Sequence, residues 1–134
     1  MSTRSYICIE LTEKAKQEFN TQNEIFGVYC HYDGYIKDGV GETLLKHYTS
    51  YAKAKRLMKH GDMSSLGDSI KECNFYNNPS LNTTFNFKDI RNSNFFMICY
   101  IYVYRIGKGW QVWGTTNRGW RSKGLLKDMP CFKH

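Results

Sequence analysis

The run FFMICYIYVY, residues 95–104, is the feature that most constrains how this chain folds. It is apolar along almost its whole length and rich in β-branched and aromatic side chains, which is typical of a strand buried on both faces. We therefore expect this strand at the centre of a sheet. The GKG that follows, with Gly107 and Gly109 at the turn, predicts a hairpin into a second strand, WQVWGTT.

Two earlier segments also predict strands. SYICIEL, residues 5–11, alternates between polar and apolar side chains, and IFGVYCHY, residues 25–32, is mainly apolar until it meets Asp33-Gly34. Alternation indicates a half-buried strand, and an Asp-Gly pair is a strong turn signal. We expect the two strands to pair as an antiparallel hairpin across a polar insert that holds a short helical piece.

Two helices are predicted next in the chain. Apolar side chains recur at helical spacing over residues 39–48, and Thr49 or Ser50 is a suitable N-cap for a second helix over residues 51–60. The outward side chains of this second helix are basic with no acid among them, which suits the negative C-terminal end of the helix dipole. These basic residues are Lys53, Lys55, Arg56 and Lys59.

The order of these elements predicts the fold class. Two strands, two helices and two strands indicate an α+β fold, in which an antiparallel sheet of about four to five strands carries two helices packed on one side. Residues 72–94, rich in Asn, Ser and Thr, predict a long irregular or weakly stranded connection. A chain of 134 residues predicts a single domain, residues 1–134.

The cysteines indicate a reducing compartment. Five cysteines are an odd number at scattered spacings, without a CxxC pair, and no signal peptide precedes them. We expect reduced and mostly buried thiols in a cytoplasmic protein without a membrane span, since residues 95–104 are too short to cross a bilayer as a helix. The cysteines are Cys8, Cys30, Cys73, Cys99 and Cys131.

Positive charge is concentrated near the C-terminus. The net charge is +7. From Arg105 onward the chain has seven Lys or Arg residues and one acid, Asp128, together with all three tryptophans, whereas the first 104 residues have twelve basic and eleven acidic residues. Such a field favours an acidic partner, which could be nucleic acid, a nucleotide or an acidic protein surface. The alternative is a solvated face that only aids solubility.

The tryptophans of this basic region suggest a binding surface. On a strand, Trp110 and Trp113 face opposite sides, so one is expected in the core and one in solvent, while Trp120 lies in a predicted loop between two arginines. Exposed aromatics beside arginine stack on bases or form protein-interface hot spots. The alternative is that the rings pack against the sheet. The candidate binding residues here are Arg105, Lys108, Trp113, Arg118, Trp120, Arg121 and Lys123.

GVYCHYDGY, residues 27–35, is dense in reactive side chains. Cys30 and His31 would face opposite sides of a strand, which argues against a nucleophilic pair, whereas His31 and Asp33 would share a face. These two could serve as the base and orienting group of a small enzyme, or as two metal ligands with a third from Asp62 or His47. The structural alternative is an Asp33-Gly34 turn, a locally bonded His31, and Val28 and Cys30 in the core. As candidate contacts we take His31, Tyr32, Asp33 and Tyr35, with Arg4.

Established catalytic and cofactor motifs are missing from the sequence. It has no P-loop, dinucleotide fingerprint, HExxH, GxSxG or zinc-ribbon spacing. We therefore expect a protein that is not an enzyme and that has no catalytic residue, metal or cofactor.

Several motifs resemble a phage protein family. MSTRSYI, GVYCHYDGY, VGETLLKHYTS, LMKHGDMSSLG and YIYVYRIGKGWQVW occur in this order. The chain is similar, over nearly its whole length, to small proteins of bacteriophages and prophages that begin with STRS and carry YCHWDGY-like, G-ILL-HY and GD-SSLG motifs. It departs from them at Tyr32, where the family has Trp, and in its longer basic tail. The resemblance implies an accessory protein in the host bacterial cytoplasm that inhibits host machinery or counters host defence.

Three functional hypotheses follow. The first is a non-enzymatic inhibitor of the anti-CRISPR type, which binds a nuclease complex or its nucleic acid through the basic, aromatic C-terminal surface. The second is a sponge that sequesters an immune signalling nucleotide in a pocket lined by Arg4, His31, Tyr32 and Asp33. The third is a small enzyme with His31 as general base. The expected partner is a bacterial defence protein or ribonucleoprotein, and the aromatic content also allows a homodimer.

Overall fold

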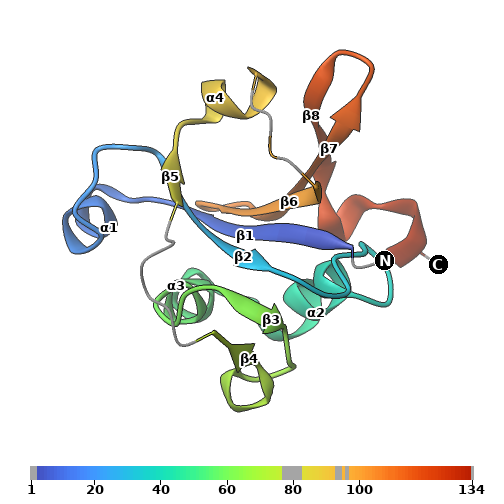
Figure 1. Ribbon diagram of the computed structural model, residues 1–134, viewed down its shortest axis with the longest axis horizontal. Coiled ribbons are helices and arrows are strands. Elements are labelled where there is room, and N and C mark those ends of the chain that lie inside the picture. Colours follow the sequence, from blue (N-terminus) through green and yellow to red (C-terminus); the bar gives the residue numbers. More distant parts are fainter. Residues whose placement is uncertain (1–2, 77–82, 93–94, 96, 134) are drawn as a thin grey trace.

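The centre of the molecule is a mixed sheet with helices on both faces, as the computed structural model in Figure 1 shows. The structure describes residues 3–76, 83–92, 95 and 97–133. In these residues the sheet has eight strands in the order β4-β3-β2-β1-β6-β7-β8, and β5 also pairs with β2. The strands are β1 (Arg4–Glu10), β2 (Ile25–Cys30), β3 (Met63–Ser65), β4 (Asn74–Phe75), β5 (Thr83–Phe85), β6 (Ile98–Arg105), β7 (Gly109–Thr116) and β8 (Gly119–Leu125).

The predicted fold class is wrong. The sheet of the described residues has eight strands instead of four to five, and it is not purely antiparallel, because β1 runs parallel to β6 and β2 parallel to β3. Four α-helices rather than two are present in this part of the chain: α1 (Glu13–Glu18), α2 (Val40–His47), α3 (Tyr51–Met58) and α4 (Phe87–Asn92). Parallel pairing places β1 in the middle of the sheet, so both of its faces need cover.

The longer predicted elements are confirmed. β6 lies between β1 and β7, which makes it a central strand, and it turns into β7 through Gly107 and Gly109, both with positive φ. β1 and β2 form the expected antiparallel pair, with Ile7 opposite Val28. The long β-prone run and the GKG turn therefore predicted the pairing of β6 with β7 correctly, and the polar insert predicted the pairing of β1 with β2.

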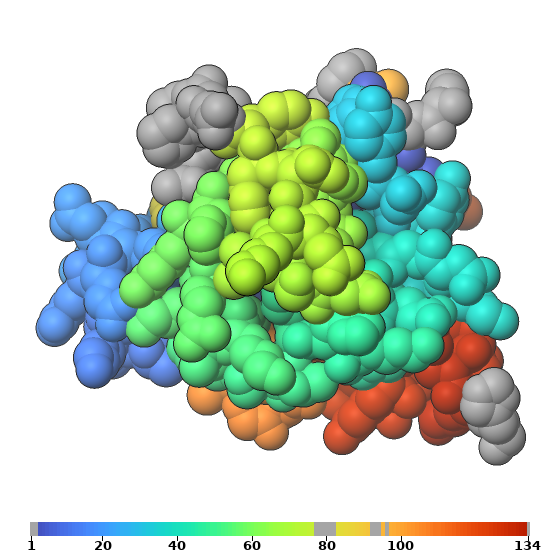
Figure 2. Space-filling view, turned by 90° about the horizontal axis from the view of Figure 1, so that it is seen from below, coloured from blue at the N-terminus to red at the C-terminus, as the bar shows by residue number. Residues whose placement is uncertain are grey.

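One face of the sheet is covered by α2 and α3, as Figures 1 and 2 show. Ser50 is the N-cap of α3, since its hydroxyl accepts the Lys53 backbone N–H at 3.2 Å. Leu44 and Leu57 pack with Ile7 and Val28 into one core cluster. In Figure 2 the segment that contains the 3₁₀ turn η1 (Ile70–Glu72) and β4 lies in front of these helices.

The opposite face carries α4 and β5. Ile90 and Phe85 pack there with Ile101 and Trp113 in a second core cluster. The irregular or weakly stranded connection predicted for residues 72–94 is confirmed by the short strands β4 and β5, but it is wrong at α4; residues 77–82 and 93–94 lie outside the described residues. β8 was not predicted either, and it is followed by the 3₁₀ turns η3 (Leu126–Asp128) and η4 (Pro130–Phe132).

The prediction of mostly buried thiols is confirmed for three of the five cysteines. Cys8, Cys30 and Cys73 are buried and unpaired, whereas Cys99 is exposed. No helix in the described part of the chain is both long and apolar enough to pass through a membrane.

Candidate anion-binding pocket

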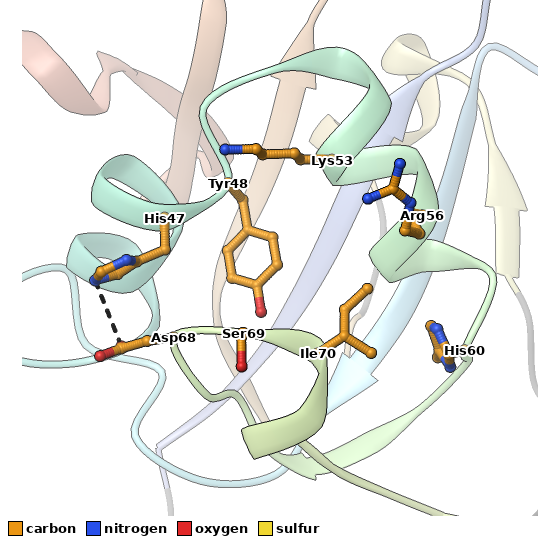
Figure 3. Close-up of a pocket in the computed structure, with 8 residues that line it drawn as sticks. All are labelled: His47, Tyr48, Lys53, Arg56, His60, Asp68, Ser69 and Ile70. Atoms are coloured by element: carbon orange, nitrogen blue, oxygen red, sulfur yellow. Dashed lines mark ion pairs between the residues drawn. The ribbon is translucent and has the colours of Figure 1, made fainter.

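A pocket of about 520 Å³ lies between the end of α2, the outer surface of α3 and the start of η1. Figure 3 shows the side chains that surround it. This volume is within the range of small-ligand sites in proteins. The lining residues are His47, Tyr48, Lys53, Arg56, His60, Asp68, Ser69 and Ile70.

The centre of this lining is formed by Tyr48 and Ile70 (Figure 3). The Tyr48 side chain is buried; its hydroxyl donates to the Gly67 carbonyl at 2.8 Å, and its own carbonyl accepts the Trp110 Nε1–H at 2.8 Å. Burial, followed by the neighbouring Cys73 thiol, raises the pKa of Tyr48, so the phenol stays neutral. Because Tyr48 is only 3% exposed, it fixes the back of the pocket but leaves almost no ring surface to a ligand, and the apolar surface that a ligand can reach belongs to Ile70.

The positive side of the pocket is one stripe of α3 and its end. Lys53, Arg56 and His60 are spaced by three and four residues, so they lie on one side of the helix, and all three are exposed. Among the described residues, Lys53 and Arg56 form no ion pair with a carboxylate. The His60 ring stacks on Phe75 at a centroid distance of 4.8 Å. Two cations are therefore available to a ligand.

The other basic residues of α3 are already paired. Lys55 and Lys59 lie 2.9 and 3.5 Å from Glu18 of α1. Lys55, and to a smaller extent Lys59, lowers the pKa of Glu18, which keeps this carboxylate ionised at neutral pH. The basic residues of α3 and its C-cap thus divide into Lys55 and Lys59, which share one carboxylate beside α1, and Lys53 and Arg56 at the pocket, which have none.

Asp68 is the only acidic residue in the pocket lining, and it lies at the far side from Arg56 (Figure 3). Its Oδ1 is 3.6 Å from Nε2 of His47, and both side chains are partly exposed. Since Asp68 is directed toward His47, the potential beside Lys53 and Arg56 stays positive. The pocket is suited to a ligand that has an apolar ring and an anionic group.

The GVYCHYDGY segment lies outside this pocket and has structural roles. Asp33 has φ 58°, which confirms the turn, and its carbonyl accepts the Val40 N–H at the start of α2 at 2.7 Å. Gly34 donates its N–H to Thr3 at 2.8 Å and accepts the Tyr102 hydroxyl at 2.6 Å. Val28 and Cys30 are fully buried, as the structural alternative predicted.

The polar side chains of that segment form a separate cluster. His31 Nδ1 is 2.6 Å from the Tyr29 hydroxyl, and the His31 ring meets Tyr32 edge-on at 4.5 Å, so His31 does bond locally. β2 ends at Cys30, and therefore His31 and Asp33 do not share a strand face. Tyr32 and Tyr35 are exposed. In the described residues, no three His, Cys, Asp or Glu side chains are grouped to hold a metal ion.

Arg4 belongs to the same cluster and is half-buried at the start of β1. Burial raises the pKa of Tyr29, and the Arg4 guanidinium, which is hydrogen-bonded to this phenol, opposes that rise. None of the residues in the hypothesised nucleotide pocket of Arg4, His31, Tyr32 and Asp33 lines the pocket beside α3.

The expectation of exposed tryptophans is wrong. Trp110, Trp113 and Trp120 are only 4, 6 and 3% exposed. Trp110 packs on the α2–α3 side, whereas Trp113 and Trp120 pack on the α4 side. These rings are therefore core residues and have no free face for stacking on a base.

The basic residues of the C-terminal region are dispersed in space. Lys108 precedes β7 and Arg118 follows it, so they are separated by a strand that spans roughly 25 Å. Arg105 donates from Nε to Glu10 at 3.1 Å and stacks on Phe87 at 4.3 Å, and Arg121 donates to the Trp120 carbonyl at 2.8 Å. Lys123 is exposed. The basic residues that are concentrated in sequence therefore divide into Arg105 and Lys108 before β7, and Arg118, Arg121 and Lys123 in the hairpin of β7 and β8.

Sequence reasoning missed the pocket. The absence of any acidic residue from α3 is a visible signal in the sequence, but the helix dipole explains it equally well. The decisive contrast between paired Lys55 and unpaired Lys53 depends on where α1 places Glu18, which no local pattern contains.

Comparison of the chain with protein-family models, with curated proteins and with solved structures gave no match.

Proposed function

We propose that this chain is a non-enzymatic binding protein that sequesters a nucleotide in the pocket between α2, α3 and η1. The observation that carries the proposal is that Lys53 and Arg56, which have no carboxylate partner in the described residues, lie in one pocket with the partly exposed apolar side chain of Ile70. A nucleotide has the matching parts, because its base offers an apolar face and its phosphate an anion. Binding alone would suffice for sequestration, so no chemical step is required.

The resemblance to phage and prophage accessory proteins supports a biological setting for this activity. In the host bacterial cytoplasm, removal of an immune signalling nucleotide would prevent a defence system from being activated. This is the second of the three functional hypotheses, moved from the Arg4 and His31 cluster to the α3 pocket.

The test is isothermal titration calorimetry with AMP, ADP-ribose and cyclic oligonucleotides. We expect heat from at least one of them, with an affinity that falls as salt is raised. The variants Lys53→Gln and Arg56→Gln should each weaken binding by about tenfold, because each removes a charged hydrogen bond. Lys14→Gln is the matched control, since Lys14 is exposed on α1 and lines none of the pockets described here. No heat from any nucleotide would refute the proposal.

A second candidate function rests on β8. Within the described residues this strand pairs with β7 alone and contacts α4; Lys123 is exposed on β8 and Arg118 is exposed in the turn before it. An acidic surface of a CRISPR nuclease complex could dock there, as the anti-CRISPR hypothesis requires. The double variant Arg118→Glu and Lys123→Glu should then weaken binding to a purified nuclease complex and flatten its salt dependence, while Lys14→Glu should not. Unchanged binding would exclude this surface.

A further inference from the structure

A second hollow adjoins the pocket on the surface of α3. It has a volume of about 500 Å³ and is lined by Tyr51, Ala52, Lys55, Arg56 and Lys59. Arg56 lines both hollows. The two hollows are therefore neighbours that share one lining side chain, Arg56.

Helix geometry explains the shared residue. At 3.6 residues per turn, Lys53, Arg56 and His60 form one stripe of α3, and Ala52 and Lys59 belong to the neighbouring stripe. Arg56 lies at the boundary between these stripes. The buried side of α3, with Ala54, Leu57 and Met58, faces away from both hollows.

The charges differ between the two hollows. At the second hollow Lys55 and Lys59 share the single carboxylate of Glu18, so these three groups keep a net charge of about one beside the unpaired Arg56. Its apolar surface comes from Ala52 and from Tyr51, whose hydroxyl is fixed to the Glu10 carbonyl at 2.7 Å. Each hollow thus has an immobilised tyrosine, and the free guanidinium lies between them.

We infer that the ligand is a dinucleotide, whose phosphodiester binds Arg56 while one base occupies each hollow. This inference rests on the proposed function and names its ligand class. Arginine binds a phosphate through two parallel N–H bonds, which fixes the ligand's position between the hollows. The first base would contact Ile70, and the second would contact Tyr51 and Ala52.

A comparison of AMP with the linear dinucleotide ApA tests the inference. AMP carries about two negative charges at neutral pH and ApA about one. If charge at a single hollow decided affinity, AMP would bind more tightly. We expect calorimetry to show the reverse, with ApA bound about tenfold more tightly because it contacts both hollows.

Two variants separate the hollows. Ala52→Leu places a larger side chain on an exposed position of the second hollow, so it should lower ApA affinity to that of AMP and leave AMP binding unchanged. Arg56→Gln should weaken both ligands, and Lys14→Gln neither. Circular dichroism of each variant checks that α3 is retained.

The possible failures are distinct. The dinucleotide inference would be overturned if AMP bound as tightly as ApA or more tightly, or if Ala52→Leu left the affinity for ApA unchanged. Binding of ADP-ribose without ApA would overturn it as well but would keep the proposed function. No heat from AMP, ApA, ADP-ribose or cyclic oligonucleotides would refute both.

Discussion

The hydroxyl of Tyr48 donates a hydrogen bond to the carbonyl of Gly67 at 2.8 Å, and this bond joins the end of α2 to the loop that leads into η1. The same phenol ring forms the central wall of the pocket. Stability of the loop and shape of the pocket therefore depend on one side chain.

Removal of this hydrogen bond should destabilise the protein. We expect Tyr48→Phe to lower the free energy of unfolding by about 1–2 kcal/mol, because the Gly67 carbonyl loses its close partner. Urea unfolding followed by circular dichroism measures the change. Tyr35→Phe is the control, since Tyr35 is 47% exposed, and its effect should stay within about 0.5 kcal/mol. Equal losses in the two variants would contradict the assigned role of Tyr48.

Asp62 should make stability depend on pH. Its side chain is 5% exposed and accepts the Tyr29 N–H at 2.8 Å, and burial raises its pKa above the ordinary value of about 3.9. The folded state then holds the proton more tightly than the unfolded state, so stability from this group falls as pH rises from that ordinary value through the raised one.

Two substitutions at Asp62 test this dependence. Asp62→Asn keeps an oxygen acceptor for Tyr29 without the charge, so it should flatten the pH profile of unfolding and be no less stable at pH 7. Asp62→Ala leaves the Tyr29 N–H unpaired and should cost about 1–3 kcal/mol. Urea unfolding between pH 4 and 8 distinguishes them, and a pH profile that Asp62→Asn leaves unchanged would count against this assignment.

The buried tryptophans should report on stability and not on ligand binding. Iodide should quench the intrinsic fluorescence weakly, because all three indoles are at most 6% exposed. Trp120→Ala should lower the free energy of unfolding by about 3–5 kcal/mol through loss of core contacts, with nucleotide affinity unchanged at a temperature where the variant is folded. Strong quenching by iodide, or a selective loss of binding, would restore the surface role expected from the sequence.

Glu18 should tune the second hollow from α1. Glu18→Gln removes the one negative charge that Lys55 and Lys59 share, so we expect ApA affinity to rise about twofold to fivefold at low salt. Glu13→Gln is the matched control on the same helix, because Glu13 pairs with Lys16 at 3.3 Å and contacts neither hollow. Identical ApA affinities of the two variants would show that the lysines are screened already.

The sequence predicted those elements whose pattern is long enough to read. β6, α2 and α3 have seven or more residues of consistent pattern. Ser50 marked the start of α3, and Gly107 marked the turn after β6. β3, β4 and β5 have three residues or fewer, too short for any period to emerge. β8 was obscured because Gly119 and Gly124 interrupt it and most of its side chains are not buried.

The order of strands could not be predicted in the same way. Periodicity indicates that a segment is a strand, but it does not identify the neighbour. The parallel contact of Ile7 with Tyr102 joins opposite ends of the chain, and the pocket likewise combines Tyr48 with Ile70 from separate elements. Both are tertiary facts that no local window contains.

The placement of β1 beside β6 has a consequence for synthesis on the ribosome. β1 is made early and its parallel neighbour late, so the nascent β1–β2 hairpin carries an open apolar edge until β6 emerges. The central sheet can be completed only near the end of translation. A message truncated before β6 would yield a chain that exposes this edge and is prone to aggregate rather than a smaller folded protein.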